Sequence, residues 1–123
     1  MKKVFALRGA TQAENTGQSI TERIAALYDA LLSENSLCEE EIISIIFSIT
    51  SDLTAKNPAS ALRASGRAKD AALFSAAEPE AGDFHPGIIR ILIHCYLESG
   101  ASPRHIYQCG AEILRPDRAF NSL

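Results

Sequence analysis

Apolar and polar positions recur with a clear period along most of this chain, and the period differs between segments. The most apolar segment, residues 87–97, alternates with period two, which gives an extended strand one wholly apolar face. Its many isoleucines also favour a strand, because β-branched side chains suit a pleated surface. The opposite face is mixed and carries Arg90, Leu92, His94 and Tyr96. The pattern predicts a strand that lies on the core with one face and holds a cation on the other.

Two other segments begin and continue as helices do. Residues 17–34 follow a possible cap at Asn15-Thr16 and carry apolar side chains at intervals of three and four. This spacing predicts an amphipathic helix that packs one face on a sheet. Asn57 stands directly before Pro58, a cap followed by the residue that best tolerates the first helical position. This pair predicts a short helix over residues 58–64.

The remaining apolar runs are short and rich in residues that favour strands. The run at 42–50 is apolar at nearly every position, so this strand should lie in the interior of the sheet. Ser102 predicts a single helical turn over residues 100–103, and Gly110 indicates a bulge or a sheet edge. Besides the strand at 87–97, the runs predict strands at residues 3–7, 42–50, 71–77 and 107–114.

The order of these elements predicts an α/β fold with a mixed sheet of roughly five strands and both helices on one face. The other face of the sheet would then lack a cover, so we expect copies of the same chain to bury it. A length of 123 residues suits one domain. We place this domain at residues 1–116 and expect the tail at 117–123 to be mobile.

Composition excludes several classes of protein. The net charge is −3 and there is no basic stripe, which argues against a nucleic-acid partner. No apolar run reaches the roughly 18 residues that a membrane span needs, and the N-terminal segment lacks the apolar stretch of a secretory signal. Cys38, Cys95 and Cys109 are widely spaced. We therefore expect reduced, buried thiols in a cytoplasmic protein.

The candidate chemistry begins with arginine. The guanidinium of Arg90 needs an acceptor, which is either a structural carboxylate or a bound anion. Arg8, Arg63 and Arg115 also stand beside apolar or turn segments, and the chain uses eight Arg against four Lys. The planar fork of Arg matches carboxylate oxygens two at a time, which Lys cannot do. A surface turn for Arg8 and a helix C-terminus for Arg63 are simpler explanations of those two residues.

Glu78 and Tyr107 lie at the ends of predicted strands and would add one carboxylate and one phenol to such a pocket. The combination suits a small polyanion that carries a hydroxyl group. The histidines and cysteines have no zinc-site spacing, and the chain contains no nucleophile, phosphate-binding or dinucleotide motif. If the protein is an enzyme, we expect it to work by electrostatic preorganisation without a metal or a cofactor.

Across nearly the whole chain, motifs in this order and spacing resemble those of the monofunctional, trimeric chorismate mutases of the pseudo-α/β-barrel class. The segments at the two ends are the most specific. In chain order the motifs are Arg8-Gly9-Ala10-Thr11 with Glu14 and Thr16, Thr50-x-Asp52-Leu53, Pro58-Ala59-x-Ala61-x-Arg63, Glu78, Arg90, Ile106-Tyr107, and Leu114-Arg115-Pro116-Asp117.

The resemblance implies an isomerase that converts chorismate to prephenate by an intramolecular Claisen rearrangement, on the pathway to phenylalanine and tyrosine. It implies a homotrimer whose sheets form a barrel-like core, with each active site between two subunits. By position, Arg90 would face the ether oxygen of the breaking bond, and Arg8 and Tyr107 would hold a substrate carboxylate. The other implied contacts are Glu78 and Ser75 at the ring hydroxyl, Arg63 and Arg115 over the mouth, and Ala59, Leu73 and Leu114 as apolar wall.

Three positions depart from the family pattern. Asn57 and Ser60 occupy a segment that often carries an aromatic residue and a Lys, and Ser75 stands where Cys is common. We expect weaker substrate capture from the first two changes and little effect from the third, because a hydroxyl also donates. Two alternatives are a trimeric sensor of small carboxylates that has lost catalysis, and an imine deaminase of the Rid type, whose characteristic sequence pattern is missing here.

Overall fold

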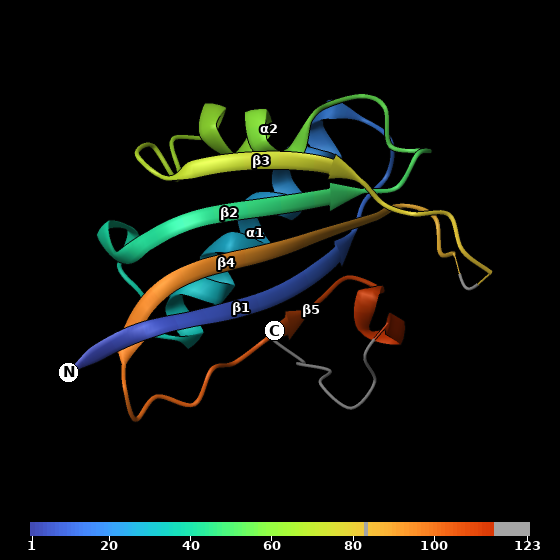
Figure 1. The fold of residues 1–123 in the computed structure, drawn as a ribbon. Coiled ribbons are helices and arrows are strands. Elements are labelled where there is room, and N and C mark those ends of the chain that lie inside the picture. Colours follow the sequence, from blue (N-terminus) through green and yellow to red (C-terminus); the bar gives the residue numbers. More distant parts are fainter. Residues whose placement is uncertain (83, 115–123) are drawn as a thin grey trace.

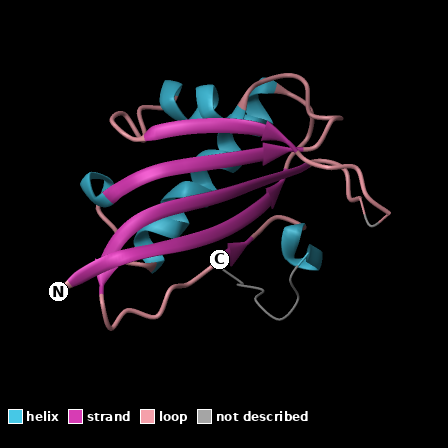
Figure 2. Ribbon diagram, viewed as in Figure 1, coloured by secondary structure: helices cyan, strands magenta, loops and turns pink. Residues whose placement is uncertain are grey.

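The computed structural model describes residues 1–82 and 84–114 of the chain. Figures 1 and 2 show one twisted sheet with helices behind it. No helix within the described ranges has the length and apolarity that crossing a membrane requires. In chain order the elements are β1 (Lys2–Gln12), α1 (Gly17–Glu34), the 3-10 turn η1 (Glu39–Glu41), β2 (Ile42–Ile49), α2 (Pro58–Ala64), β3 (Ala72–Ala77), β4 (Ile88–Glu98), β5 (Ile106–Tyr107) and η2 (Ala111–Leu114).

The sheet is mixed and has five strands in the order β3-β2-β4-β1-β5. β4 lies in the middle and pairs antiparallel with β1 on one side and β2 on the other. The outer pairs, β2 with β3 and β1 with β5, are parallel. The predicted fold class is therefore confirmed, and the strand that carries Arg90 is hydrogen-bonded on both sides.

The core lies between the sheet and α1, as the period-two pattern of β4 predicted. All five apolar residues on one face of β4 are buried, and Arg90 lies on the other face. They pack against the stripe of α1, whose buried residues are Ile20, Ile24, Leu27, Tyr28 and Leu31. Both helices begin where the caps predicted. The side chain of Thr16 accepts a hydrogen bond from the Ser19 amide, and that of Asn57 accepts one from the Ala59 amide.

The face of the sheet turned away from the helices is largely uncovered among the described residues (Figure 1), except at one end, where Ala10 and Ile88 pack against Tyr107 and Ala111. Large apolar side chains are exposed along it: Val4 is 54%, Ile46 38%, Phe74 66% and Tyr96 45% exposed. β2 is an interior strand, as expected. Its two faces differ, however, because Ile45 and Phe47 on the face toward α1 are buried, whereas Ile46 on the other face is exposed in this single chain.

Two predicted elements, the end of a third and one part of the cysteine prediction are wrong. The strand expected at 3–7 continues to Gln12, so Arg8 lies in a strand paired with β4 and not in a surface turn. Residues 100–103 form a turn and an extended connection rather than a helical turn at Ser102. The strand expected at 107–114 ends at Tyr107, because Cys109 and Gly110 take left-handed conformations with φ of 57° and 102° that break extended pairing. The chain then turns into η2. All three thiols are free, but only Cys95 is buried, whereas Cys38 and Cys109 are exposed. The expected tail at 117–123 lies outside the described residues.

Candidate active site

Arg90 lies on the open sheet face near the beginning of the central strand β4, beside Ser48 of β2 and Ala10 of β1. Its Nε atom is 3.2 Å from Oε1 of Glu78, and the two side chains are 42% and 18% exposed. This Nε atom is itself buried and makes no hydrogen bond to another described residue, so the pair is held by charge rather than by a well-aligned N–H···O bond. The Ser48 hydroxyl donates to the same Glu78 oxygen over 2.5 Å.

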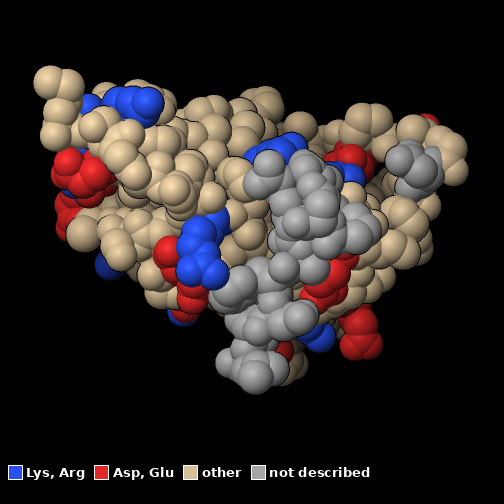
Figure 3. Space-filling model, turned by 90° about the horizontal axis from the view of Figure 1, so that it is seen from below, with Lys and Arg blue, Asp and Glu red and all other residues tan. Residues whose placement is uncertain are grey.

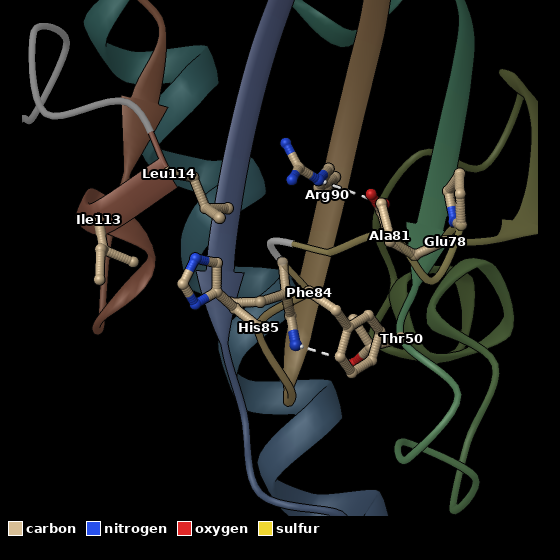
Figure 4. A pocket seen from close by; sticks show the side chains of 10 residues that line it. Thr50, Glu78, Ala81, Phe84, His85, Arg90, Ile113 and Leu114 are labelled. Atoms are coloured by element: carbon tan, nitrogen blue, oxygen red, sulfur yellow. Dashed lines mark hydrogen bonds and ion pairs between the residues drawn. The ribbon is translucent and has the colours of Figure 1, made fainter.

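Two cavities share the Arg90 side chain. The first has a volume of about 310 Å³ and reaches from the end of β2 to η2. In Figure 4, Arg90 and Glu78 meet on one side of it, while Ile113 and Leu114 stand across from Thr50 and Phe84. The second cavity, of about 220 Å³, lies along the open sheet face and is lined by Arg8, Gly9, Ile46, Ser48, Arg90, Ile91, Leu92 and Tyr107.

The structure brings five of the predicted site residues to these two cavities: Arg8, Glu78, Arg90, Tyr107 and Leu114. Tyr107 is held at 3% exposure because β5 pairs with the end of β1. Arg8 is exposed on β1, and its backbone amide donates to Nδ1 of His105 over 2.9 Å. Arg115, which was also predicted as a site residue, lies outside the described residues.

The other predicted site residues form a second group around α2 and β3, at the far edge of the sheet. Within the described part of the chain, Ala59, Arg63, Leu73 and Ser75 line neither cavity. Arg63 donates to the backbone carbonyls of Ala68 and Ala71 over 3.1 and 2.6 Å. Ser75 donates its hydroxyl hydrogen to Oδ1 of Asn57 over 2.8 Å, so two of the positions that depart from the family pattern are in contact.

Several cavity residues had no predicted role. Ser48, Thr50, Phe84 and His85 all line one of the two cavities. A serine inside the otherwise apolar run of β2 was a signal for Ser48, and Thr50 belongs to a quoted motif. The connection between β3 and β4, which carries Phe84 and His85, has no periodicity from which their positions could be inferred.

The ionisable groups with perturbed pKa lie away from Arg90. A hydrogen bond from Tyr28, with a second from the Ala68 amide, lowers the pKa of Glu39. Burial, together with the carboxylate of Glu39, raises the pKa of Tyr28. Burial also raises the pKa of Cys95 to about 11, which keeps this thiol protonated and unreactive. Tyr28 and Glu39 lie in the helical layer and Cys95 lies on the core face of β4, so none of these shifts belongs to the candidate site.

Charge on the surface is mixed. On the face drawn in Figure 3, basic and acidic side chains of the described residues stand close together, and neither sign covers a continuous area. A nucleic-acid backbone requires a continuous basic surface, whereas a small anion requires only a few arginines at one point. The arrangement at Arg8 and Arg90 is of the second kind.

Comparisons with known proteins agree with this arrangement. The family model described as chorismate mutase type I matches residues 4–118. Chorismate mutase AroH from Thermus thermophilus is 33% identical over 117 residues, which cover 93% of this chain and 95% of that protein. A solved chorismate mutase from Clostridium thermocellum is also 33% identical and superimposes with a TM-score of 0.80, covering 89% of this chain and 98% of the other.

The fold and the matches together define an isomerase of the intramolecular transferase class that acts on chorismate. The chain belongs to the type I, or AroH-class, chorismate mutase family. Its activity is the conversion of chorismate to prephenate, a step in aromatic amino acid biosynthesis.

Proposed function

We propose that this rearrangement takes place in the cavities around Arg90, with Arg90 facing the ether oxygen of chorismate. The reaction moves bonds within one molecule, so no enzyme group needs to give or take a proton. Negative charge gathers on the ether oxygen as the C–O bond breaks. A guanidinium fixed on a strand meets this charge without reorganising, and it cannot act as a general acid at neutral pH.

The observation that carries this proposal is the position of Arg90. It is the one residue that lines both of the cavities described above, and it carries a positive charge. Its partner Glu78 also lines the first cavity, so its carboxylate can accept a hydrogen bond from the ring hydroxyl of chorismate. Arg8 and Tyr107 line the second cavity and would hold a substrate carboxylate there. Holding the flexible substrate in its compact conformation adds an entropic contribution to the rate.

We also propose that the protein is a homotrimer with its active sites between subunits. The apolar residues exposed on the open sheet face, Val4, Ile46, Phe74 and Tyr96, support an interface with copies of the chain. The separation of the predicted site residues into two groups supports a shared site. In this arrangement Ala59, Arg63, Leu73 and Ser75 of one subunit complete the cavity at Arg90 of the next.

We propose that the trimer acts in the cytoplasm and requires no metal or cofactor. Three free thiols, two of them exposed, suit a reducing compartment. The proposed chemistry relies on fixed charges already carried by the chain, chiefly Arg90 and Arg8, and no step in it requires a redox or acyl-transfer group.

Arg90→Ala tests the assignment directly. We expect kcat to fall by about 100-fold or more, the typical loss when one preorganised donor to a developing anion is removed. The assay follows loss of the diene absorbance of chorismate and formation of prephenate. Arg23→Ala is the matched control, because Arg23 is exposed on α1, which covers the opposite face of the sheet. Turnover within a few-fold of the parent in Arg90→Ala would show that Arg90 is structural.

A further inference from the structure

The turn that follows β2 holds the beginning of β4, just before Arg90. The backbone amide of Thr50 donates to the Ile88 carbonyl over 3.1 Å, and the Ile88 amide donates back to the Thr50 hydroxyl over 3.1 Å. One step earlier, the Gly87 amide donates to Oδ1 of Asp52 over 3.2 Å. Three hydrogen bonds from two residues of this turn thus fix the chain where it enters the strand of Arg90.

The chain at this point has little freedom to shift without breaking these bonds. Thr50 is 1% exposed, and its bond with Ile88 is buried. Gly87 has φ of +73°, and a side chain there would meet the Ala13 carbonyl oxygen at 3.0 Å. The Gly87 carbonyl accepts from the Ala13 amide over 2.8 Å. A buried amide left without its acceptor would be costly, so the backbone would move to recover a partner.

The same turn also holds the other member of the ion pair. The backbone amide of Glu78 donates to the carbonyl of Ile49, the last residue of β2, over 3.0 Å. Ile49, Thr50 and Asp52, which we call the β2-end clamp, therefore bind the backbone beside both Glu78 and Arg90. The 3.2 Å separation between these two side chains depends on one short segment.

We propose that Thr50 and Asp52 are positioning residues for the rearrangement, acting through the backbone of Gly87 and Ile88 on the guanidinium of Arg90. The proposal rests on the role of Arg90 proposed above. An interaction made mainly in the transition state governs kcat, whereas contacts that hold the substrate equally in both states govern KM. Because the clamp acts on Arg90, its loss lowers kcat and leaves KM nearly unchanged.

The test compares variants that differ only in the hydrogen bond. Thr50→Val keeps the shape and removes the acceptor, whereas Thr50→Ser keeps the hydroxyl. Asp52→Ala removes the carboxylate, whereas Asp52→Asn keeps an acceptor oxygen. We expect kcat to fall on the order of 10- to 100-fold in Thr50→Val and Asp52→Ala, with KM within about threefold of the parent. The Ser and Asn variants recover most of the parent rate.

Ser51→Ala is the control, because Ser51 lies between the two residues and, among the described residues, its hydroxyl donates only to the exposed Glu80. Thermal unfolding of every variant is measured alongside, since a general loss of folding would lower activity and stability together in all of them. The proposal is overturned if Thr50→Val and Asp52→Ala keep kcat within about twofold of the parent, or if only KM changes. If Arg90→Ala is itself fully active, the role proposed for Arg90 is wrong, and the proposal for Thr50 and Asp52 is overturned with it.

Discussion

The two groups of predicted site residues make a shared active site testable by mixing subunits. Arg90→Ala damages the group at the two cavities, and Arg63→Ala damages the group around α2. If each site takes one group from each of two neighbours, a randomly mixed trimer contains sites built from the undamaged group of either chain. In a mixed trimer of either 2:1 composition, one site in three receives both undamaged groups, so purified mixed trimers recover about a third of the parent activity.

The experiment uses two affinity tags on co-expressed chains, so that only mixed trimers are purified before the chorismate assay. Two controls fix the scale. Arg90→Ala mixed with the parent chain retains about half of the sites, whether or not sites are shared. Arg90→Ala mixed with Arg8→Ala shows no recovery, because both changes damage the same group. The shared site is refuted if mixed Arg90→Ala and Arg63→Ala trimers are no more active than the mean of the two unmixed variants.

Three further predictions concern stability. Tyr28→Phe lowers the free energy of unfolding, measured in urea at pH 7, by about 1 kcal/mol, a value reduced because Glu39 is exposed. The pKa of Glu39 is lowered in the folded protein, so the stability contributed by this bond is fully present above the pKa of an unfolded glutamate and is lost as pH falls through the folded-state pKa. An equal loss of unfolding free energy in Tyr28→Phe at pH 7 and at pH 3 would contradict this reasoning. Asn57→Ala costs about 2 kcal/mol, whereas Asn57→Ser, which caps α2 but is too short for Ser75, costs about half as much in the same urea titration. Gly110→Ala destabilises by at least about 1 kcal/mol in thermal unfolding, because φ is +102° and the added methyl meets a glutamine side chain; an unchanged Tm would show that the turn relaxes freely.

Period and capping predicted most of the fold. Alternation in residues 87–97 predicted which side of β4 is buried, and Asn57 with Pro58 predicted α2 to the residue. These signals are local, since they depend on neighbouring positions only. β5 was overestimated because its end is set by left-handed backbone at Cys109 and Gly110, and a cysteine gives no signal for that conformation.

Less of the candidate site could be predicted from periodicity alone. The pattern identified Arg90 as a cation on an open strand face but left its partner undecided between a carboxylate and a ligand. The structure supplies Glu78 as the partner and places both residues at a cavity, so the two alternatives are not exclusive. Thr50 and Ser48 were missed because their contacts cross between strands that are far apart in sequence. The roles assigned to individual residues stay predictions until the variants are measured.

Because β4 is central and β3 is an edge strand, the sheet should not open at the same stability in all its parts. β4 is hydrogen-bonded to a strand on each side, so its backbone amides should exchange with solvent only on global unfolding. The strand that carries Arg90 is therefore among the last parts of the sheet to open. β3 has one paired neighbour and an open outer edge, and it carries Ser75 close to α2. If Ser75 belongs to the active site, as proposed, opening of β3 alone would inactivate the enzyme while spectroscopic probes of the core still report a native protein. Inactivation should then precede the main unfolding transition.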